Sequence, residues 1–187
     1  MQLTLTYRWE HALIAATVEA ASKKCPNCYL GRTAIQKLLY FMNVLGVPMR
    51  YTFDIHHYGP FCPNVMHDVD WLVADDVIAD RSSEERYSNY KPSQGWPELS
   101  EQYSEKLDEY SEKIQDVCNA LSDLSPDALE LIATLDFSYR WVRARGGKGP
   151  WKTAAIQKFK SIKKNKFGDD DIDAWYGVLV DADLIKE

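Results

Sequence analysis

The clearest candidates for metal chemistry are two cysteines near the N-terminus. Cys25 and Cys28 are separated by two residues, which is the spacing of half a tetrahedral zinc site. A complete site needs two more ligands, and the candidates are Cys62, His56, His57 and His67. The chain has no second CxxC pair and no HxxxH pair. We therefore treat Cys25 and Cys28 as weak metal candidates and expect neither a bound metal nor a cofactor.

Acid–base chemistry is suggested by His56 and His57, which precede Tyr58. Neighbouring side chains of an extended strand point to opposite faces, so these two imidazoles do not form a local pair. No serine or cysteine lies in a nucleophile-elbow pattern. The acidic run Asp169–Asp171 is what a helix N-terminus favours for electrostatic reasons alone. We therefore predict no catalytic residue and no enzymatic activity.

Basic residues are concentrated in one segment. Residues 140–166 hold ten Lys/Arg and no Asp/Glu, although the formal net charge of the chain is −6, so the remainder sums to −16. Two interpretations stay open: a surface for an anionic partner, or pairing with acidic helices of the same protein. The candidate partner-binding residues are Arg140, Arg143, Arg145, Lys148, Trp151 and Lys152. Trp151 has a second interpretation as a buried core residue.

The same segment contains the loop GGKGPWKT, residues 146–153, which places glycines and a lysine before a predicted helix. It lacks the GxxxxGK[ST] spacing of a phosphate-binding loop, and no hydrophobic strand precedes it. The backbone geometry that cradles phosphates depends on that spacing. The sequence therefore predicts an anion-attracting loop but no nucleotide site.

Helical periodicity indicates the elements that position these residues. Apolar spacing predicts helices over residues 7–22, 33–45, 63–75 and 100–124, and further helices that begin near 125, 151 and 169. Thr33 with Gln36 fits a capping box at the start of the second helix. Ser125 and Pro126 suit the N-cap and first position of a later one. The chain is therefore predicted to be mainly helical.

Alternating residues predict three short strands at 51–57, 77–81 and 86–91, which would form one small antiparallel sheet. Its last two strands would make a wing-like hairpin. The predicted fold is mainly α (α+β), with a winged-helix-like αβαββ centre, an N-terminal helix and a C-terminal helical subdomain. Residues 1–98 would hold the first two parts and 99–187 the helical subdomain packed on them, within one compact structural domain.

Composition and the lengths of the apolar runs indicate where in the cell the protein is found. Hydrophobic residues make up 45% of the 187 residues, with six Trp and eleven Tyr, which is enough for a folded core. No apolar run approaches the roughly 20 residues that span a bilayer. The N-terminus lacks the basic region and cleavage site of a signal peptide. We expect a cytoplasmic protein with no membrane association and mostly reduced thiols.

Two motifs carry a resemblance to a known family. Residues 35–40 read IQKLLY, and residues 58–60 read YGP before a helix that ends at Ile78. They resemble a bacterial family of uncharacterised YwgA-like proteins and SocA-like antitoxin domains, also called Panacea. The resemblance covers residues 35–78 well and 125–180 loosely, where Pro150-Trp151 matches a family Pro-Trp. The family motif residues are Gln36, Lys37, Leu38, Leu39, Tyr40, Tyr58, Gly59 and Pro60.

The resemblance implies a mainly helical fold with a small sheet, and a toxin-neutralising or adaptor protein that works by contact without catalysis. The partner would be a toxin or another protein. The alternative is a winged-helix DNA-binding regulator that uses the basic 140–166 segment. Residues 63–75 would then be the recognition helix, but they hold three Asp and no Lys or Arg, which suits a DNA groove poorly. We therefore expect protein recognition first and nucleic-acid binding second. Tyr58, Gly59 and Pro60 are expected to shape a turn.

Overall fold

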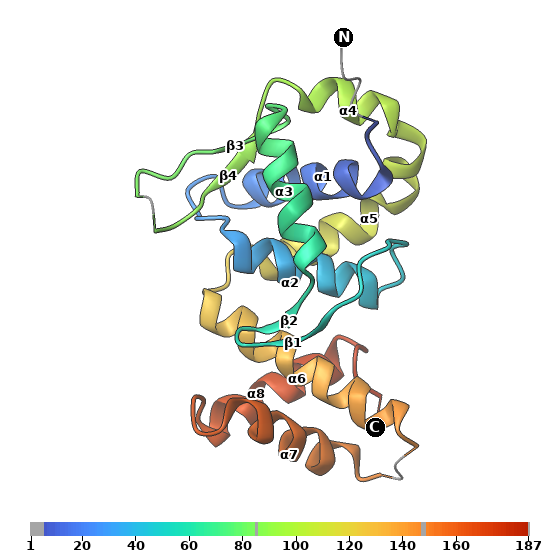
Figure 1. The fold of residues 1–187 in the computed structure, drawn as a ribbon. Coiled ribbons are helices and arrows are strands. Elements are labelled where there is room, and N and C mark those ends of the chain that lie inside the picture. Colours follow the sequence, from blue (N-terminus) through green and yellow to red (C-terminus); the bar gives the residue numbers. More distant parts are fainter. Residues whose placement is uncertain (1–5, 85, 147–148, 187) are drawn as a thin grey trace. The chain divides into compact units, whose positions relative to one another are not determined.

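The computed structural model describes residues 6–84, 86–146 and 149–186 (Figure 1). Over these residues it is mainly helical, which confirms the predicted class. The helices are α1 (Trp9–Lys24), α2 (Arg32–Val44), α3 (Pro63–Ala74), α4 (Trp96–Gln102), α5 (Ser104–Leu121), α6 (Pro126–Ala144), α7 (Trp151–Lys163) and α8 (Asp169–Asp181). The strands are β1 (Asp54–His56), β2 (Gly59–Phe61), β3 (Ile78–Asp80) and β4 (Tyr90–Pro92).

The chain divides into two compact units. Unit 1 is Met1–Phe53 with Cys62–Leu124, and unit 2 is Asp54–Phe61 with Ser125–Glu187. This division differs from the expected subdomains 1–98 and 99–187. The long helix α5 packs against α1 and α2, so it completes unit 1 and does not head the C-terminal helices. The β1–β2 hairpin belongs to unit 2, where β2 packs against α6.

Unit 1 is organised around α1, which contacts α2, α3, α4, α5 and β4 (Figure 1). Apolar side chains on α1 and α2 are completely enclosed, among them Leu13, Ile14, Val18, Ile35, Leu38 and Leu39. Each enclosed side chain of this size contributes roughly 1.5–3 kcal/mol from removal of apolar surface from water. The periodic apolar residues that predicted these helices are therefore the residues that hold unit 1 together.

The capping box predicted at Thr33 and Gln36 is wrong. The N-cap of α2 is Gly31, and Gln36 is buried. Its side-chain amide donates to the carbonyl of Cys62 at 2.9 Å, and the Cys62 N–H donates back to Gln36 Oε1 at 3.0 Å. Cys62 is the N-cap residue of α3, where backbone groups lack partners within the helix. Gln36 therefore fastens α2 to the start of α3.

The predicted three-stranded sheet is also wrong. The described residues form two separate antiparallel pairs, β1 with β2 and β3 with β4. The chain reverses at His57-Tyr58, Gly59 adopts a φ of +89°, and Pro60 lies opposite Ile55. The YGP motif therefore forms the turn and second strand of a hairpin instead of ending a lone strand. The hairpin predicted from 77–81 and 86–91 is confirmed as β3–β4, and β1 pairs with β2 instead of joining that hairpin.

Unit 2 is built on α6, which packs against α7, α8 and β2 (Figure 1). The predicted N-cap is confirmed, since the N–H of Ala128 donates to Ser125 Oγ at 3.2 Å. The last helix begins at Asp169, as predicted, with Gly168 as its N-cap and Asp169–Asp171 in the first turn. There the three carboxylates face the positive end of the helix dipole. Among the described residues, no helix combines the length and the apolar character needed to cross a membrane.

Candidate functional site

The two weak metal-ligand candidates, Cys25 and Cys28, are bonded to each other. Cys25 and Cys28 form a disulfide with an S–S distance of 1.98 Å, so the expectation of reduced thiols is wrong for this pair. Zinc is bound by thiolates, and two bonded sulfurs offer none. Cys62 and Cys118 are free and buried. Within residues 6–84, 86–146 and 149–186, no group of three or more His, Cys, Asp or Glu side chains is arranged to hold a metal ion.

The adjacent histidines contact different aromatic rings. The His56 ring lies 5.2 Å from that of Phe61, and the His57 ring lies 4.8 Å from that of Tyr58. The backbone of His57 contributes a further contact, because its carbonyl accepts a hydrogen bond from Lys163 Nζ at 2.8 Å. The two imidazoles are therefore not brought to one centre.

The family motif residues mostly position elements. Leu38 and Leu39 are enclosed in the core of unit 1, and Lys37 is buried. Tyr40 is also buried, with its ring 5.6 Å from that of Phe53. Only Tyr58 is presented to solvent, at the tip of the β1–β2 hairpin. The motif residues therefore serve local packing and the hairpin turn more than they form a binding site.

Of the nine cations of the basic segment that the structure describes, five form ion pairs within unit 2. These pairs are Arg140–Asp136 (2.7 Å), Lys152–Asp173 (3.3 Å), Lys160–Asp169 (2.7 Å), Lys163–Glu130 (2.8 Å) and Lys166–Asp127 (3.0 Å). Unit 2 contains eleven Lys/Arg and eleven Asp/Glu, so its formal charge is zero, whereas unit 1 with eleven and seventeen carries −6. For these five residues, pairing with the protein's own acidic helices is the correct interpretation.

The most buried of these pairs anchors the β1–β2 hairpin. Glu130 on α6 is 2% exposed, and its two oxygens accept hydrogen bonds from Lys163 at 2.8 Å and Lys166 at 2.9 Å. Lys163 also reaches the carbonyl of His57. Desolvation lowers the pKa of Lys166, but hydrogen bonds with Glu130 and Asp127 outweigh it and leave that pKa raised. Lys163 is therefore a buried structural residue, and Lys166, whose side chain is 41% exposed, is held by two carboxylates.

Three other cations of the segment lie against aromatic rings instead. Arg145 and Lys158 lie 4.0 and 4.1 Å from the centre of the Trp141 ring. Arg143 lies 5.4 Å from the Trp151 ring and donates to the Tyr139 hydroxyl at 2.7 Å. Among the described residues, none of these three cations forms an ion pair with a carboxylate. These contacts form two clusters, Trp141 with Arg145 and Lys158, and Trp151 with Arg143, which we together call the arginine–tryptophan surface.

Helical spacing explains how this surface forms. Trp141 and Arg145 are four residues apart at the end of α6, so their side chains meet on one face. Trp151 and Lys158 are seven residues apart on α7, which packs along α6. Arg143 and Arg145 are exposed, and Trp141, Trp151 and Lys158 are half-buried. Basic residues at the end of α6 are also favoured by the helix dipole.

The arginine–tryptophan surface contains half of the residues predicted for partner binding. Arg143, Arg145 and Trp151 belong to it, whereas Arg140 and Lys152 are ion-paired. Lys148 lies outside the described residues. Sequence reasoning missed Trp141 and Lys158. The spacing of Trp141 and Arg145 was a readable signal, but the approach of Lys158 depends on the packing of α7 against α6.

Such a surface is suited to recognising a carboxylate or phosphate. Guanidinium groups that stack on indole rings keep N–H donors at their edges, and these donors pair with two oxygens of a planar anion. Each exposed cation–π contact is worth about 0.5–1 kcal/mol, which orients the cation before a partner arrives. Tryptophan and arginine are also the residues that most often dominate the energetics of protein interfaces.

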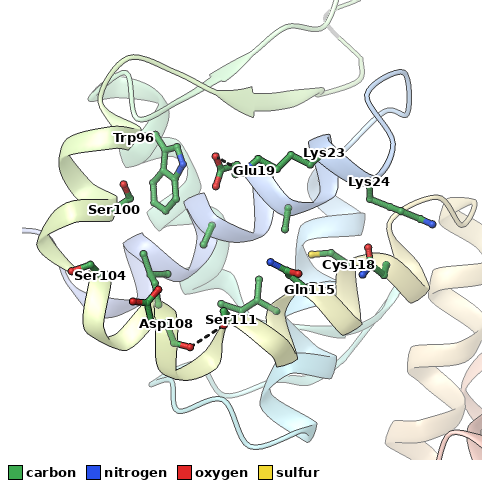
Figure 2. A pocket seen from close by; sticks show the side chains of 15 residues that line it. Glu19, Lys23, Lys24, Trp96, Ser100, Ser104, Asp108, Ser111, Gln115 and Cys118 are labelled. Carbon is green, nitrogen blue, oxygen red and sulfur yellow. Dashed lines mark hydrogen bonds and ion pairs between the residues drawn. The ribbon is translucent and has the colours of Figure 1, made fainter.

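Unit 1 contains a groove of about 540 Å³ among α1, α4 and α5 (Figure 2). Small side chains such as Ala16, Ala20 and Ser104 leave this space, and Trp96 closes one end. Its charged lining includes the ion pair Lys23–Glu19 at 3.0 Å, within α1. None of the sequence-predicted site residues lines the groove.

Comparison with known proteins supplies no assignment. No protein-family model matches the chain, and no curated protein matches its sequence. The resemblance to SocA-like antitoxin domains, and everything that it implies about function, stays a hypothesis.

Proposed function

We propose that this protein is a non-enzymatic protein-binding module of the SocA-like antitoxin or adaptor type. It recognises an acidic surface on a toxin or another protein partner through the arginine–tryptophan surface. The observation that carries the proposal is the set of three cations, Arg143, Arg145 and Lys158, that contact aromatic rings and pair with no carboxylate among the described residues.

Two features favour a protein partner over DNA. Phosphate neutralisation dominates DNA affinity, so a DNA-binding unit needs a net excess of cations, and the formal charge of unit 2 is zero. The helix α3, which a winged-helix regulator would insert into the major groove, contains Asp68 and Asp70 and no Lys or Arg. Asp70 is paired with Arg32 at 2.7 Å, so that arginine is also engaged within the protein.

The test is co-expression with the genes that neighbour its own, followed by growth measurement and co-purification. The wild-type chain is expected to bind, and to suppress, a growth inhibitor encoded beside it. The variant Arg143→Glu/Arg145→Glu/Lys158→Glu is expected to lose both effects while keeping its fold. The matched control Lys24→Glu/Arg81→Glu/Arg86→Glu makes the same charge change at exposed positions of unit 1 and is expected to act like wild type.

Two outcomes would reject the proposal. If no neighbour encodes an inhibitor that this chain binds, or if the triple variant acts like wild type, the arginine–tryptophan surface does not serve this role. Binding of labelled duplex DNA at about 50 mM salt that is lost near 200 mM would favour the regulator instead. Fluorescence anisotropy with the purified chain makes that measurement.

A further inference from the structure

The disulfide between Cys25 and Cys28 has no part in the proposed function. It lies in unit 1, in the loop that joins α1 to α2. Both cysteines are half-buried, and Pro26 and Asn27 between them are exposed, so the bond lies at the surface of the unit. A thiolate of another molecule must approach one of the two sulfurs for thiol–disulfide exchange to begin. The position of this bond meets that requirement.

The fold around this loop does not depend on the disulfide. The two cysteines are only three positions apart, and a disulfide stabilises a fold less when the loop that it closes is short. The loop is also held by hydrogen bonds to β4. The N–H of Leu30 donates to Asn89 Oδ1 at 3.2 Å, and the N–H of Tyr90 donates to the Leu30 carbonyl at 2.9 Å. The two sulfurs therefore stay close together when the bond opens, and the bond can form again.

A lysine of β4 places a positive charge beside Cys28. Lys91 Nζ donates to the carbonyl of Pro26 at 3.0 Å and makes a longer contact, 3.4 Å, with the carbonyl of Cys28. Among the described residues, Lys91 forms no ion pair with a carboxylate. A neighbouring ammonium group stabilises a cysteine thiolate. Lys91 therefore favours the thiolate of Cys28.

Cys25 lies in a less favourable setting for a thiolate. It is the C-cap residue of α1, where the helix dipole presents its negative end. Of the two lysines before it, Lys23 is paired with Glu19 at 3.0 Å, and Lys24 is exposed, so solvent and salt screen its charge. In thiol–disulfide exchange, the sulfur with the more stable thiolate leaves faster. The two settings therefore select Cys28 as the leaving sulfur and Cys25 as the sulfur that is attacked.

We propose that the Cys25–Cys28 disulfide is a thiol–disulfide exchange site that accepts two electrons from a dithiol. One thiolate of the dithiol attacks Cys25 Sγ, the bond to Cys28 breaks, and Cys28 leaves as a thiolate. The second thiolate of the dithiol attacks its own sulfur in the mixed disulfide, so that Cys25 leaves as a thiolate and the dithiol becomes a cyclic disulfide. The two cysteines take up the two protons that the dithiol has lost. This inference does not rest on the proposed function, which concerns unit 2.

The first test is reduction of the folded full chain by dithiothreitol near neutral pH, followed by iodoacetamide. Trypsin cleaves after Lys24 and Arg32, so one peptide carries both Cys25 and Cys28 for mass spectrometry. This peptide is expected to gain two alkyl groups without loss of circular dichroism, and to lose them when excess oxidised dithiothreitol is added before alkylation. Cys118 is expected to stay unlabelled, because burial raises its pKa to about 12. A bond that opens only after urea unfolds the chain would overturn the proposal.

The second test concerns Lys91. Lys91→Met is expected to slow reduction several-fold, because the Cys28 thiolate loses its neighbouring charge, and Lys91→Arg is expected to keep most of the wild-type rate. Lys24→Met removes an exposed lysine beside Cys25 and is the matched control, expected to reduce at the wild-type rate. Equal rates for Lys91→Met and Lys24→Met would contradict the assignment of Cys28 as the leaving sulfur.

The third test compares the two thiols separately. Iodoacetamide is expected to alkylate Cys28 in the Cys25→Ser variant several-fold faster than Cys25 in the Cys28→Ser variant, since the thiolate is the reacting form. Equal rates, or a faster Cys25, would overturn the predicted order of attack. The wild-type and Lys91→Met measurements decide the proposal even if either serine variant fails to fold.

Discussion

Two buried glutamates, one in each unit, differ in how many of their carboxylate oxygens accept hydrogen bonds. Glu130 in unit 2 accepts from Lys163 on one oxygen and Lys166 on the other. Glu10 in unit 1 is also buried, but among the described residues only its Oε1 has donors. A completed buried pair serves the structure, since removing either partner leaves an uncompensated charge.

The cations of the basic segment show the same contrast. Lys163 and Lys166 are engaged by carboxylates and hold the β1–β2 hairpin of unit 2. Among the residues that the structure describes, Arg143, Arg145 and Lys158 contact aromatic rings and a hydroxyl but no carboxylate, so their charge is oriented without an ion pair. The account therefore assigns paired charge to stability and unpaired charge to binding.

The largest effect is expected for Lys163→Met. The substitution removes the partner of Glu130 Oε1 and the donor to the His57 carbonyl, so a buried charge loses half of its compensation. The free energy of unfolding is expected to fall by about 3–5 kcal/mol, measured by urea denaturation. Lys164→Met, at the exposed neighbouring position, is expected to change it by less than about 0.5 kcal/mol. Equal stabilities of the two variants would contradict the structural role of Lys163.

A smaller loss is expected for Tyr51→Phe. Asp68 keeps Arg8 but loses the hydroxyl donor at 2.7 Å, and the change is otherwise conservative in shape. A hydrogen bond to a charged group is worth about 1.5–3 kcal/mol, and the unfolding free energy is expected to fall by that amount. Tyr87→Phe, on an exposed tyrosine of the same unit, is the control. A Tyr51→Phe chain as stable as this control would show that Asp68 does not need the hydroxyl.

The pH dependence of stability is expected to depend on protonation of the His11 imidazole. Burial lowers the pKa of this imidazole, although Asp68 opposes the shift. Below the ordinary pKa of about 6.5, the unfolded state therefore binds more protons than the folded state, and stability falls as the pH drops towards the lowered folded value. Stability measured from about pH 7 to about pH 5 is expected to fall more steeply for wild type than for His11→Asn. Parallel curves would contradict the burial of a neutral imidazole.

The smallest effect is expected for Glu10→Gln. Weakening the charged bond to the Arg50 N–H destabilises the fold, while removing a buried charge whose only ion-pair contact among the described residues is the long one to Arg50 stabilises it. The unfolding free energy is expected to change by less than about 1 kcal/mol, whereas Glu130→Gln is expected to lose several times more. Similar losses of unfolding free energy in Glu10→Gln and Glu130→Gln would contradict the claim that the two glutamates have different roles.

Local signals predicted the elements well and the long-range contacts poorly. The N-cap at Ser125 depends on residues three apart and was predicted correctly. Arg140 was predicted to bind a partner, although Asp136, with which it forms an ion pair, lies only four residues away. Gln36 was misassigned because its true partner, Cys62, lies 26 residues away. The β1–β2 hairpin was missed because Gly59 and Pro60 are typical strand breakers, yet here they form the paired strand itself.

The candidate sites were harder to predict for the same reason. The basic segment was found from composition, but its division into paired and unpaired cations depends on contacts such as Lys163–Glu130, which are 33 residues apart. The contact between Glu10, at the start of α1, and Arg50 joins residues 40 positions apart, and nothing in the local sequence marks it. Periodicity specifies faces of helices, but it does not specify which charges meet when those faces pack.

The central claim, that the unpaired cations of unit 2 recognise an acidic protein, is tested most directly by calorimetric titration of the co-purified partner. Wild type and Arg143→Glu/Arg145→Glu/Lys158→Glu are compared in the same buffer, after circular dichroism has established equal folding. The account predicts a loss of affinity of about 100-fold or more in the triple variant and none in the control Lys24→Glu/Arg81→Glu/Arg86→Glu. An affinity of the triple variant within about twofold of wild type would contradict it.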